Sequence, residues 1–314
     1  MKKILSLVLA LVMVFTLFAL TGCKKKDSTV IRIAALKGPT GMGIAPLMKS
    51  ETYPRYNITL NSDPSAVASA FISGEFDIAA VPVNLAATLY NKLEGDVVIL
   101  GINTLGVLYI LENGEEIHSM SDLSGRTLYA TGQGSTPEYI LNYLIEKNGV
   151  SDLSVEFKAE HSELAALMAS GGADLGMLPE PMVTTTLVKN DALRVAIDLT
   201  EEWGKVSDTK LVQGVVIARR SFVNEHKSAV DAFIADYGKA VELINTGSDE
   251  ACQMIVDAEI LPAAPVAKAA IPRCNIVWIT GSDMKASCMA MFEVLFGSDP
   301  KSVGGKLPGD DICY

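Results

Sequence analysis

Ser73-Gly74-Glu75-Phe76-Asp77-Ile78 and Ser170-Gly171-Gly172-Ala173-Asp174-Leu175 repeat one pattern at an offset of 97 residues. In both copies a helical pattern ends at the glycine and a buried strand follows the aspartate. The same offset places Pro82 on Pro179 and the strand-like run 30–34 on 127–131. Two matches at one offset predict two similar lobes rather than a chance resemblance.

Short β-branched runs alternate with helical patterns from residue 30 onward, which is typical of α/β architecture. We expect each lobe to be a mostly parallel sheet flanked by helices. Glycine-rich loops at 37–43 and 132–136 follow corresponding strands of the two lobes. The carboxyl ends of the strands in such sheets are the usual place for a ligand, so these loops are candidate binding elements.

The pattern of strands and helices also predicts where the chain crosses between the lobes. We expect 30–112 to form the first part of lobe 1, 113–210 to form lobe 2, and 211–314 to return to lobe 1 with C-terminal helices. The two crossings would make a two-strand hinge. A loop is expected at 200–210 and one long amphipathic helix at 222–245.

The N-terminus is typical of an export signal. Lys2 and Lys3 precede an almost purely apolar run, 4–20, that is short for a spanning helix. The run ends in Leu20-Thr21-Gly22-Cys23, which resembles the bacterial lipobox. The resemblance implies a signal peptide at 1–22, acylation of Cys23 (palmitate among the acyl chains) and a lipidated tether at 23–29. An ordinary signal peptide or membrane anchor with an incidental cysteine is the alternative.

Composition excludes several classes of protein. The chain is 49% hydrophobic and 20% charged, unlike disordered, collagenous or disulfide-dense sequences. The sequence pI is 4.8, whereas nucleic-acid binders usually present a basic face. Removing 1–22 leaves 24 basic against 37 acidic residues, a net charge of −13. We expect an acidic body and no nucleic-acid partner.

Several short motifs together resemble the solute-binding lipoproteins of bacterial ABC importers. They are the lipobox, Leu123-Ser124-Gly125-Arg126 before a strand, Gly134-Ser135 at a helix start, Ser170-Gly171-Gly172-Ala173-Asp174, Glu180-Pro181 and Gln213-Gly214-Val215-Val216-Ile217. The most similar members are the nitrate, sulfonate, taurine and thiamine-precursor group. The resemblance implies the type II periplasmic-binding-protein fold, lobe closure around a small polar or aromatic organic solute, no cofactor, a monomer, and delivery to an ABC permease and its ATPase outside a bacterial membrane.

The predicted ligand-binding residues lie in the strand-to-helix loops and at the returning strand. Helix N-termini there carry free N–H groups and about +0.5 charge, which favours anions or polar oxygens. These residues are Thr40, Gly41, Met42, Asn84, Asn103, Gln133, Gly134, Ser135, Thr136, Glu180 and Gln213. Tight turns are the alternative for the glycines, and a helix N-cap is the alternative for Thr136.

Glu180 and Lys37 each have two interpretations. The Glu180 carboxylate either accepts hydrogen bonds from a ligand amine or aminopyrimidine, or is buried against nearby backbone amides. Lys37 either pairs with an anionic group or is a solvated loop lysine. With Glu180 in the cleft, an amine-bearing or zwitterionic solute fits slightly better than nitrate.

Nothing in the sequence predicts catalytic or metal-binding residues. The same fold hosts pyrimidine-forming and chorismate-dehydrating enzymes, so an enzyme is one alternative function and a sensory lipoprotein is another. His118, His161 and His226 share no motif with Cys, Asp or Glu and are expected on the surface. Cys252, Cys274, Cys288 and Cys313 allow three complete disulfide pairings, with buried thiols as the alternative.

Overall fold

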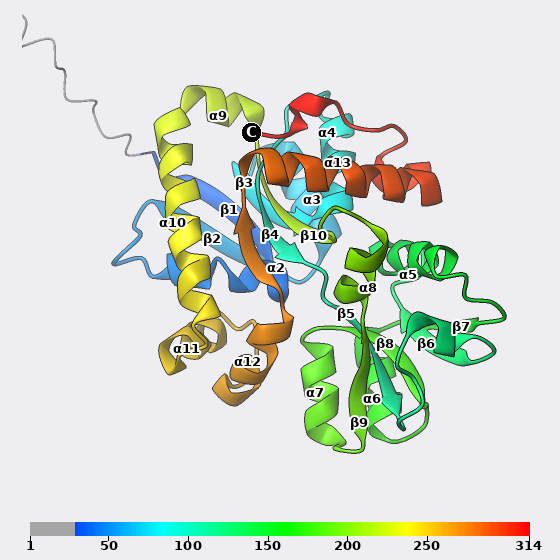
Figure 1. Ribbon diagram of the computed structural model, residues 1–314. Coiled ribbons are helices and arrows are strands. Elements are labelled where there is room, and N and C mark those ends of the chain that lie inside the picture. The colour runs from blue at the N-terminus through cyan, green and yellow to red at the C-terminus, as the bar shows by residue number, and fades with distance from the viewer. Residues whose placement is uncertain (1–28) are drawn as a thin grey trace, which may run out of the picture.

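The computed structural model describes residues 29–314, and both the predicted signal peptide and Cys23 lie outside this range. Two sheets form the centres of two lobes (Figure 1). The strands of the six-stranded sheet of lobe 1 are β1 (Ile31–Leu36), β2 (Tyr56–Asn61), β3 (Ile78–Pro82), β4 (Val98–Leu105), β10 (Val212–Ala218) and β11 (Ile276–Ile279). The strands of the five-stranded sheet of lobe 2 are β5 (Leu108–Asn113), β6 (Thr127–Thr131), β7 (Ser154–Lys158), β8 (Leu175–Pro179) and β9 (Leu193–Asp198).

The predicted repeat is confirmed by the order of the strands. Lobe 1 has the order β2-β1-β3-β10-β4-β11, and lobe 2 has β7-β6-β8-β5-β9. Each strand of lobe 2 therefore has a counterpart at the same place in the sheet of lobe 1. The helix before β8 likewise corresponds to the helix before β3. In both lobes the first three strands are parallel: β1 pairs with β2 and β3, and β6 pairs with β7 and β8.

The strands that connect the lobes are antiparallel to their neighbours in each sheet. β10, which returns from lobe 2, is antiparallel to β3 and β4, and β5, which enters lobe 2, is antiparallel to β8 and β9. The sheets are therefore mixed rather than mostly parallel. The first crossing lies between Leu105 and Leu108, so the predicted boundary at 112/113 is too late: β5 belongs to the second sheet. The second crossing lies between Val206 and Val212. We call these two crossings the hinge.

Helices cover both faces of each sheet (Figure 1). They are α2 (Pro39–Met42), α3 (Pro64–Ser73), α4 (Val83–Lys92), α5 (Thr136–Lys147), α6 (His161–Ala169), α7 (Met182–Lys189), α8 (Leu199–Val206), α9 (Arg220–Glu225), α10 (Lys227–Asn245), α11 (Asp249–Asp257), α12 (Ala264–Ala270) and α13 (Gly281–Ser298). Short 3-10 turns occupy Ala45–Met48, Met120–Leu123, Ile271–Arg273, Pro300–Val303 and Asp310–Ile312.

Two predictions about helices are wrong. The expected loop at 200–210 is mostly helix α8, whose first turn is stabilised by the Asp198 side chain accepting from Thr200 N at 2.7 Å. The expected single helix at 222–245 is two helices, because His226 leaves helical geometry between α9 and α10.

One hydrophobic cluster continues across both lobes. It joins buried side chains of lobe 1, such as Val215 and Phe292, to side chains of lobe 2, such as Leu128 and Ile140. Helix α13 extends over the six-stranded sheet of lobe 1 toward α5 (Figure 1), and Tyr139 on α5 donates to Asp299, just past the end of α13. The lobes therefore share packed contacts besides the covalent hinge.

Within 29–314 no helix combines the length and apolar character needed to cross a bilayer. The same residues contain no group of three or more His, Cys, Asp or Glu placed to hold a metal ion.

Candidate functional site

A cavity of about 750 Å³ lies between the two lobes, and we call it the cleft. Such a volume suits a small organic molecule. Lobe 1 contributes residues from α2, α3 and α4, with Thr104 from β4 and Gln213 from β10. Lobe 2 contributes the loop after β6 and the starts of α5 and α6, and the hinge contributes Val107. A bound molecule would therefore contact both lobes at once.

Five of the predicted ligand-binding residues line the cleft. They are Thr40, Asn84, Ser135, Thr136 and Gln213, and they come from both lobes. Gln213 has a second role, because its Oε1 accepts from Val107 N at 2.8 Å and so joins the first crossing of the hinge to the start of β10. Ser135, rather than Thr136, is the N-cap residue of α5.

Five other predicted residues lie near the cleft without lining it. Gly41 packs so closely on strand β1 that a Cβ atom would stand 2.3 Å from Leu36 O, which explains the glycine by packing alone. Met42 is buried in the core, and Asn103 is buried and donates to Thr40 O at 2.9 Å. Gln133 is exposed, and the N–H of Gly134 donates to Glu138.

Glu180 is not part of the cleft. Its side chain is fully buried and accepts from Arg273 Nε at 2.6 Å and from Thr184 N and Oγ1 at 3.1 and 2.9 Å. The structure thus corresponds to the buried alternative for this carboxylate, with an arginine that sequence spacing gave no reason to expect. On the surface, Lys37 Nζ lies 3.8 Å from Glu259 Oε2.

The N-terminal turns of four helices line the cleft. They contribute Pro64 and Ser65 from α3, Asn84 and Leu85 from α4, Thr136 and Pro137 from α5, and His161 from α6. The first N–H groups of a helix lack partners within the helix, and the helix dipole makes this end positive. The α3 end is already capped by the Asp63 carboxylate, whereas the ends of α4, α5 and α6 have no side-chain cap. Three uncapped ends around one cavity favour an anionic or oxygen-rich ligand.

The charged residues of the cleft also favour an anionic ligand. Lys92 and His161 line it, whereas no Asp or Glu of residues 29–314 does, although the chain is strongly acidic overall. Asp63 lies just outside, where its carboxylate caps α3 by accepting from Ser65 N and Oγ at 2.8 and 2.7 Å. These bonds lower the pKa of Asp63.

His161 is exposed, as predicted from the sequence, and it also lines the cleft, which was not predicted. Its Nδ1 lies 2.7 Å from Thr131 Oγ1, at the end of β6. Partial loss of hydration lowers the pKa of the ring, against a smaller opposing effect of Glu160. The repeat offers a signal for this position: 97 residues before His161 is Pro64, which opens α3 and also lines the cleft.

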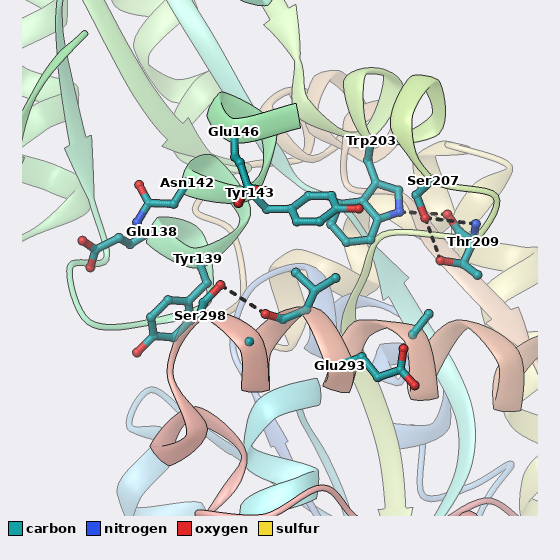
Figure 2. Close-up of a pocket in the computed structure, with 13 residues that line it drawn as sticks. Glu138, Tyr139, Asn142, Tyr143, Glu146, Trp203, Ser207, Thr209, Glu293 and Ser298 are labelled. Carbon is teal, nitrogen blue, oxygen red and sulfur yellow. Dashed lines mark hydrogen bonds between the residues drawn. The ribbon is translucent and has the colours of Figure 1, made fainter. Parts of the chain in front are cut away.

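A second cavity, of about 820 Å³, lies between α5, α13 and the chain that follows α8 (Figure 2). Tyr143 and Trp203 face each other there, with ring centres 4.9 Å apart, and Trp203 Nε1 donates to Thr209 O. Glu138, Glu146 and Glu293 make its lining acidic. It lacks the converging helix N-termini of the cleft, so we take the cleft as the candidate site.

Comparisons with known proteins agree with this architecture. The family model described as NMT1/THI5 like matches residues 57–251, which is more than half of the chain. No curated protein matches the chain. Of the solved structures, an ABC transporter from Parabacteroides distasonis is 23% identical with a TM-score of 0.78, over 91% of this chain and 99% of that one.

Two further solved structures share the fold. The periplasmic aliphatic sulphonate binding protein SsuA from Escherichia coli is 17% identical with a TM-score of 0.71, over 88% of this chain and 90% of that one. The periplasmic nitrate-binding protein NrtA from Synechocystis PCC 6803 is 11% identical with a TM-score of 0.61, over 91% of this chain and 87% of that one. The expected type II periplasmic-binding-protein fold is confirmed.

Proposed function

Because the chain belongs to the NMT1/THI5-like family, we propose that it is an extracytoplasmic solute-binding protein of an ABC importer. Its cleft captures a small organic solute that carries an anionic group. The observation that carries this proposal is the lining of the cleft: the uncapped N-termini of α4, α5 and α6 and Lys92 line it, and no carboxylate among residues 29–314 does.

The solute class follows from the two kinds of surface in the cleft. Helix N-termini and Lys92 suit a sulfonate, a carboxylate or a similar oxyanion. Ala68, Ile72, Leu85 and Val107 provide apolar contact for a carbon skeleton. The expectation of an amine-bearing solute requires Glu180 in the cleft, whereas this carboxylate is paired with Arg273 outside it. Solved relatives named for sulphonate and nitrate binding support an oxyanion.

Capture requires no chemistry on the solute. Contacts with Thr40 and Asn84 on one lobe and with Thr136 on the other are complete only when the lobes are close together. Binding therefore shifts the population toward the closed arrangement. The closed arrangement is then what a membrane permease recognises before its ATPase drives uptake.

The location of the protein follows from its N-terminus. We propose that export removes 1–22 and that lipidation of Cys23 holds the protein on the outer side of a bacterial membrane. Two or more acyl chains give stable anchoring where one chain is marginal. Its working unit is a monomer, because both walls of the cleft come from one chain.

Calorimetric titration of the chain from residue 24 to 314 tests the proposed solute class. The probes are ethanesulfonate, nitrate, taurine and ethylammonium, which vary charge at small size. We expect ethanesulfonate to bind at least tenfold more tightly than ethylammonium, and Thr136→Ala to weaken it. Tighter binding of ethylammonium, or no binding of any anion, would refute the proposal.

A further inference from the structure

We propose that His161 is a specificity-determining residue of the cleft, donating from Nε2 to an anionic oxygen of the solute and strengthening that contact when the ring carries a second proton. This inference rests on the proposed function, since it assumes that the cleft binds an anion. It adds that affinity for an oxyanion increases as pH falls, although the oxyanion itself keeps its charge.

The ring of His161 is anchored through one nitrogen, and this leaves the other for a ligand. Nδ1 lies 2.7 Å from the hydroxyl of Thr131, which is buried at the end of β6. The histidine opens α6 and lines the cleft, so the ring stands at the positive end of a nine-residue helix. No hydrogen bond to Nε2 occurs within residues 29–314.

The threonine hydroxyl lets the anchor persist in both protonation states. A hydroxyl both donates and accepts, so it bonds either neutral tautomer of the ring at Nδ1. When the ring is protonated, both nitrogens are donors: Nδ1–H bonds Thr131 Oγ1 and Nε2–H points toward the ligand. Protonation thus converts a weak or absent donor into a charged one without moving the ring.

The surroundings of His161 set the sign of the effect. The pKa of the ring is lowered mainly by loss of hydration, and the neighbouring Glu160 raises it by less. The other ionisable residues on α6 and on the elements packed against it are Glu163, Tyr129, Glu156, Lys158 and Lys189, and Lys92 lines the cleft with it. The free ring is therefore neutral at pH 7, and a bound anion favours its protonation.

The test compares ethanesulfonate affinity at pH 5 and pH 8 in the chain 24–314, because a sulfonate stays ionised over that range. For the unchanged protein we expect affinity to be about tenfold higher at pH 5, which corresponds to a shift of about one pKa unit on binding. His161→Gln retains a neutral donor near the Nε2 position, and its affinity should hardly depend on pH. His118→Gln, on an exposed residue outside the cleft, should keep the full pH dependence.

A second variant, His161→Asn, and an NMR titration of the unchanged protein keep the proposal testable if His161→Gln misfolds. His161→Asn keeps a group near Nδ1 for Thr131 but cannot reach the solute, so its affinity should be low at both pH values. In NMR, the titration midpoint of the His161 ring should move to higher pH when ethanesulfonate is added to the unchanged protein.

The possible failures are distinguishable. If ethanesulfonate binds with the same pH dependence in His161→Gln, or if the NMR midpoint does not move, the role of His161 is refuted while the anion-binding cleft stands. If ethanesulfonate does not bind the unchanged protein at either pH, the proposed function fails and the role of His161 fails with it.

Discussion

Arg273 Nε donates to Glu180 Oε1 at 2.6 Å, and this pair joins lobe 1 to lobe 2 beside the hinge. The same guanidinium donates to Thr184 Oγ1 at 2.7 Å, and the Arg273 carbonyl accepts from Tyr109 OH at 2.8 Å. Asn275, two residues later, donates to Gly106 O within the first crossing. The segment 273–275 is therefore a further non-covalent connection between the lobes.

Removing this arginine should destabilise the fold. Arg273→Ala leaves the fully buried Glu180 carboxylate without its counter-charge, and losing one partner of a buried pair costs about 3 kcal/mol. Urea unfolding of the chain 24–314 measures this loss. Arg126→Ala is the matched control: its ion pair with Glu116 is exposed, so the loss should stay below about 1 kcal/mol. Equal losses would contradict the structural role of Arg273.

The companion change separates stability from binding. Glu180→Gln keeps an oxygen for Thr184 but removes the charge, so the free energy of unfolding should fall. Affinity for ethanesulfonate should change less than threefold, because the side chain does not line the cleft. A large loss of affinity in folded Glu180→Gln would restore this residue as a ligand contact.

A carboxylate placed in the cleft should repel an anionic solute. Gln213→Glu has the same shape and still accepts from Val107 N, so the hinge contact is preserved. A unit charge at about 4 Å is worth about 4 kcal/mol at intermediate dielectric, and we expect ethanesulfonate to bind at least tenfold more weakly at pH 8. Gln253→Glu, on the exposed face of α11, adds the same charge and should have no effect. Unchanged affinity in Gln213→Glu would contradict an anionic ligand.

Lys92 should contribute the long-range part of anion binding. It lines the cleft but is exposed, so Lys92→Ala should weaken ethanesulfonate binding about three- to tenfold at low salt and less at high salt. Titrations at two salt concentrations measure this. Lys189→Ala, on an exposed lysine of α7 outside the cleft, is the control. An effect of equal size in both variants would show only a change in net charge.

The cysteines should behave as free, protected thiols. Cys252, Cys274, Cys288 and Cys313 are unpaired in the structure. Burial raises the pKa of Cys313 to about 11, so its thiolate is scarce at pH 8 and labelling of the native protein should be slow, rising about tenfold per pH unit below that pKa. Thiol counts on denatured 24–314 should be four with or without reductant. A lower count without reductant would reveal a disulfide.

The sequence predicted the repeated order of the elements well, because the offset between Ser73-Gly74 and Ser170-Gly171 reflects a real correspondence between α3–β3 and α6–β8. The sequence did not predict features that depend on pairing between strands far apart in the chain. Strand β5 belongs to lobe 2 through β8 and β9, and no local pattern at 108–113 indicates that.

The same limit applies to the site. Loop residues Thr40, Asn84 and Thr136 were predictable because strand-to-helix loops meet at one sheet edge. Glu180 was not, because its partner Arg273 lies 93 positions away and enters only when the chain returns to lobe 1. The exposed position of His161 was predictable, but its place in the wall of the cleft was not, because the signal for it lies at Pro64, 97 positions earlier, and not among its neighbours in sequence.

The most direct test of the account is native mass spectrometry of the chain 24–314, purified after exposure to the small molecules of its host and then denatured to release what it holds. The account predicts one bound solute per chain that carries an anionic oxygen group and is released with unchanged mass. Its binding should be reduced in Gln213→Glu and retained in Glu180→Gln. Recovery of a cationic solute, or of a product formed from the bound molecule, would contradict the account.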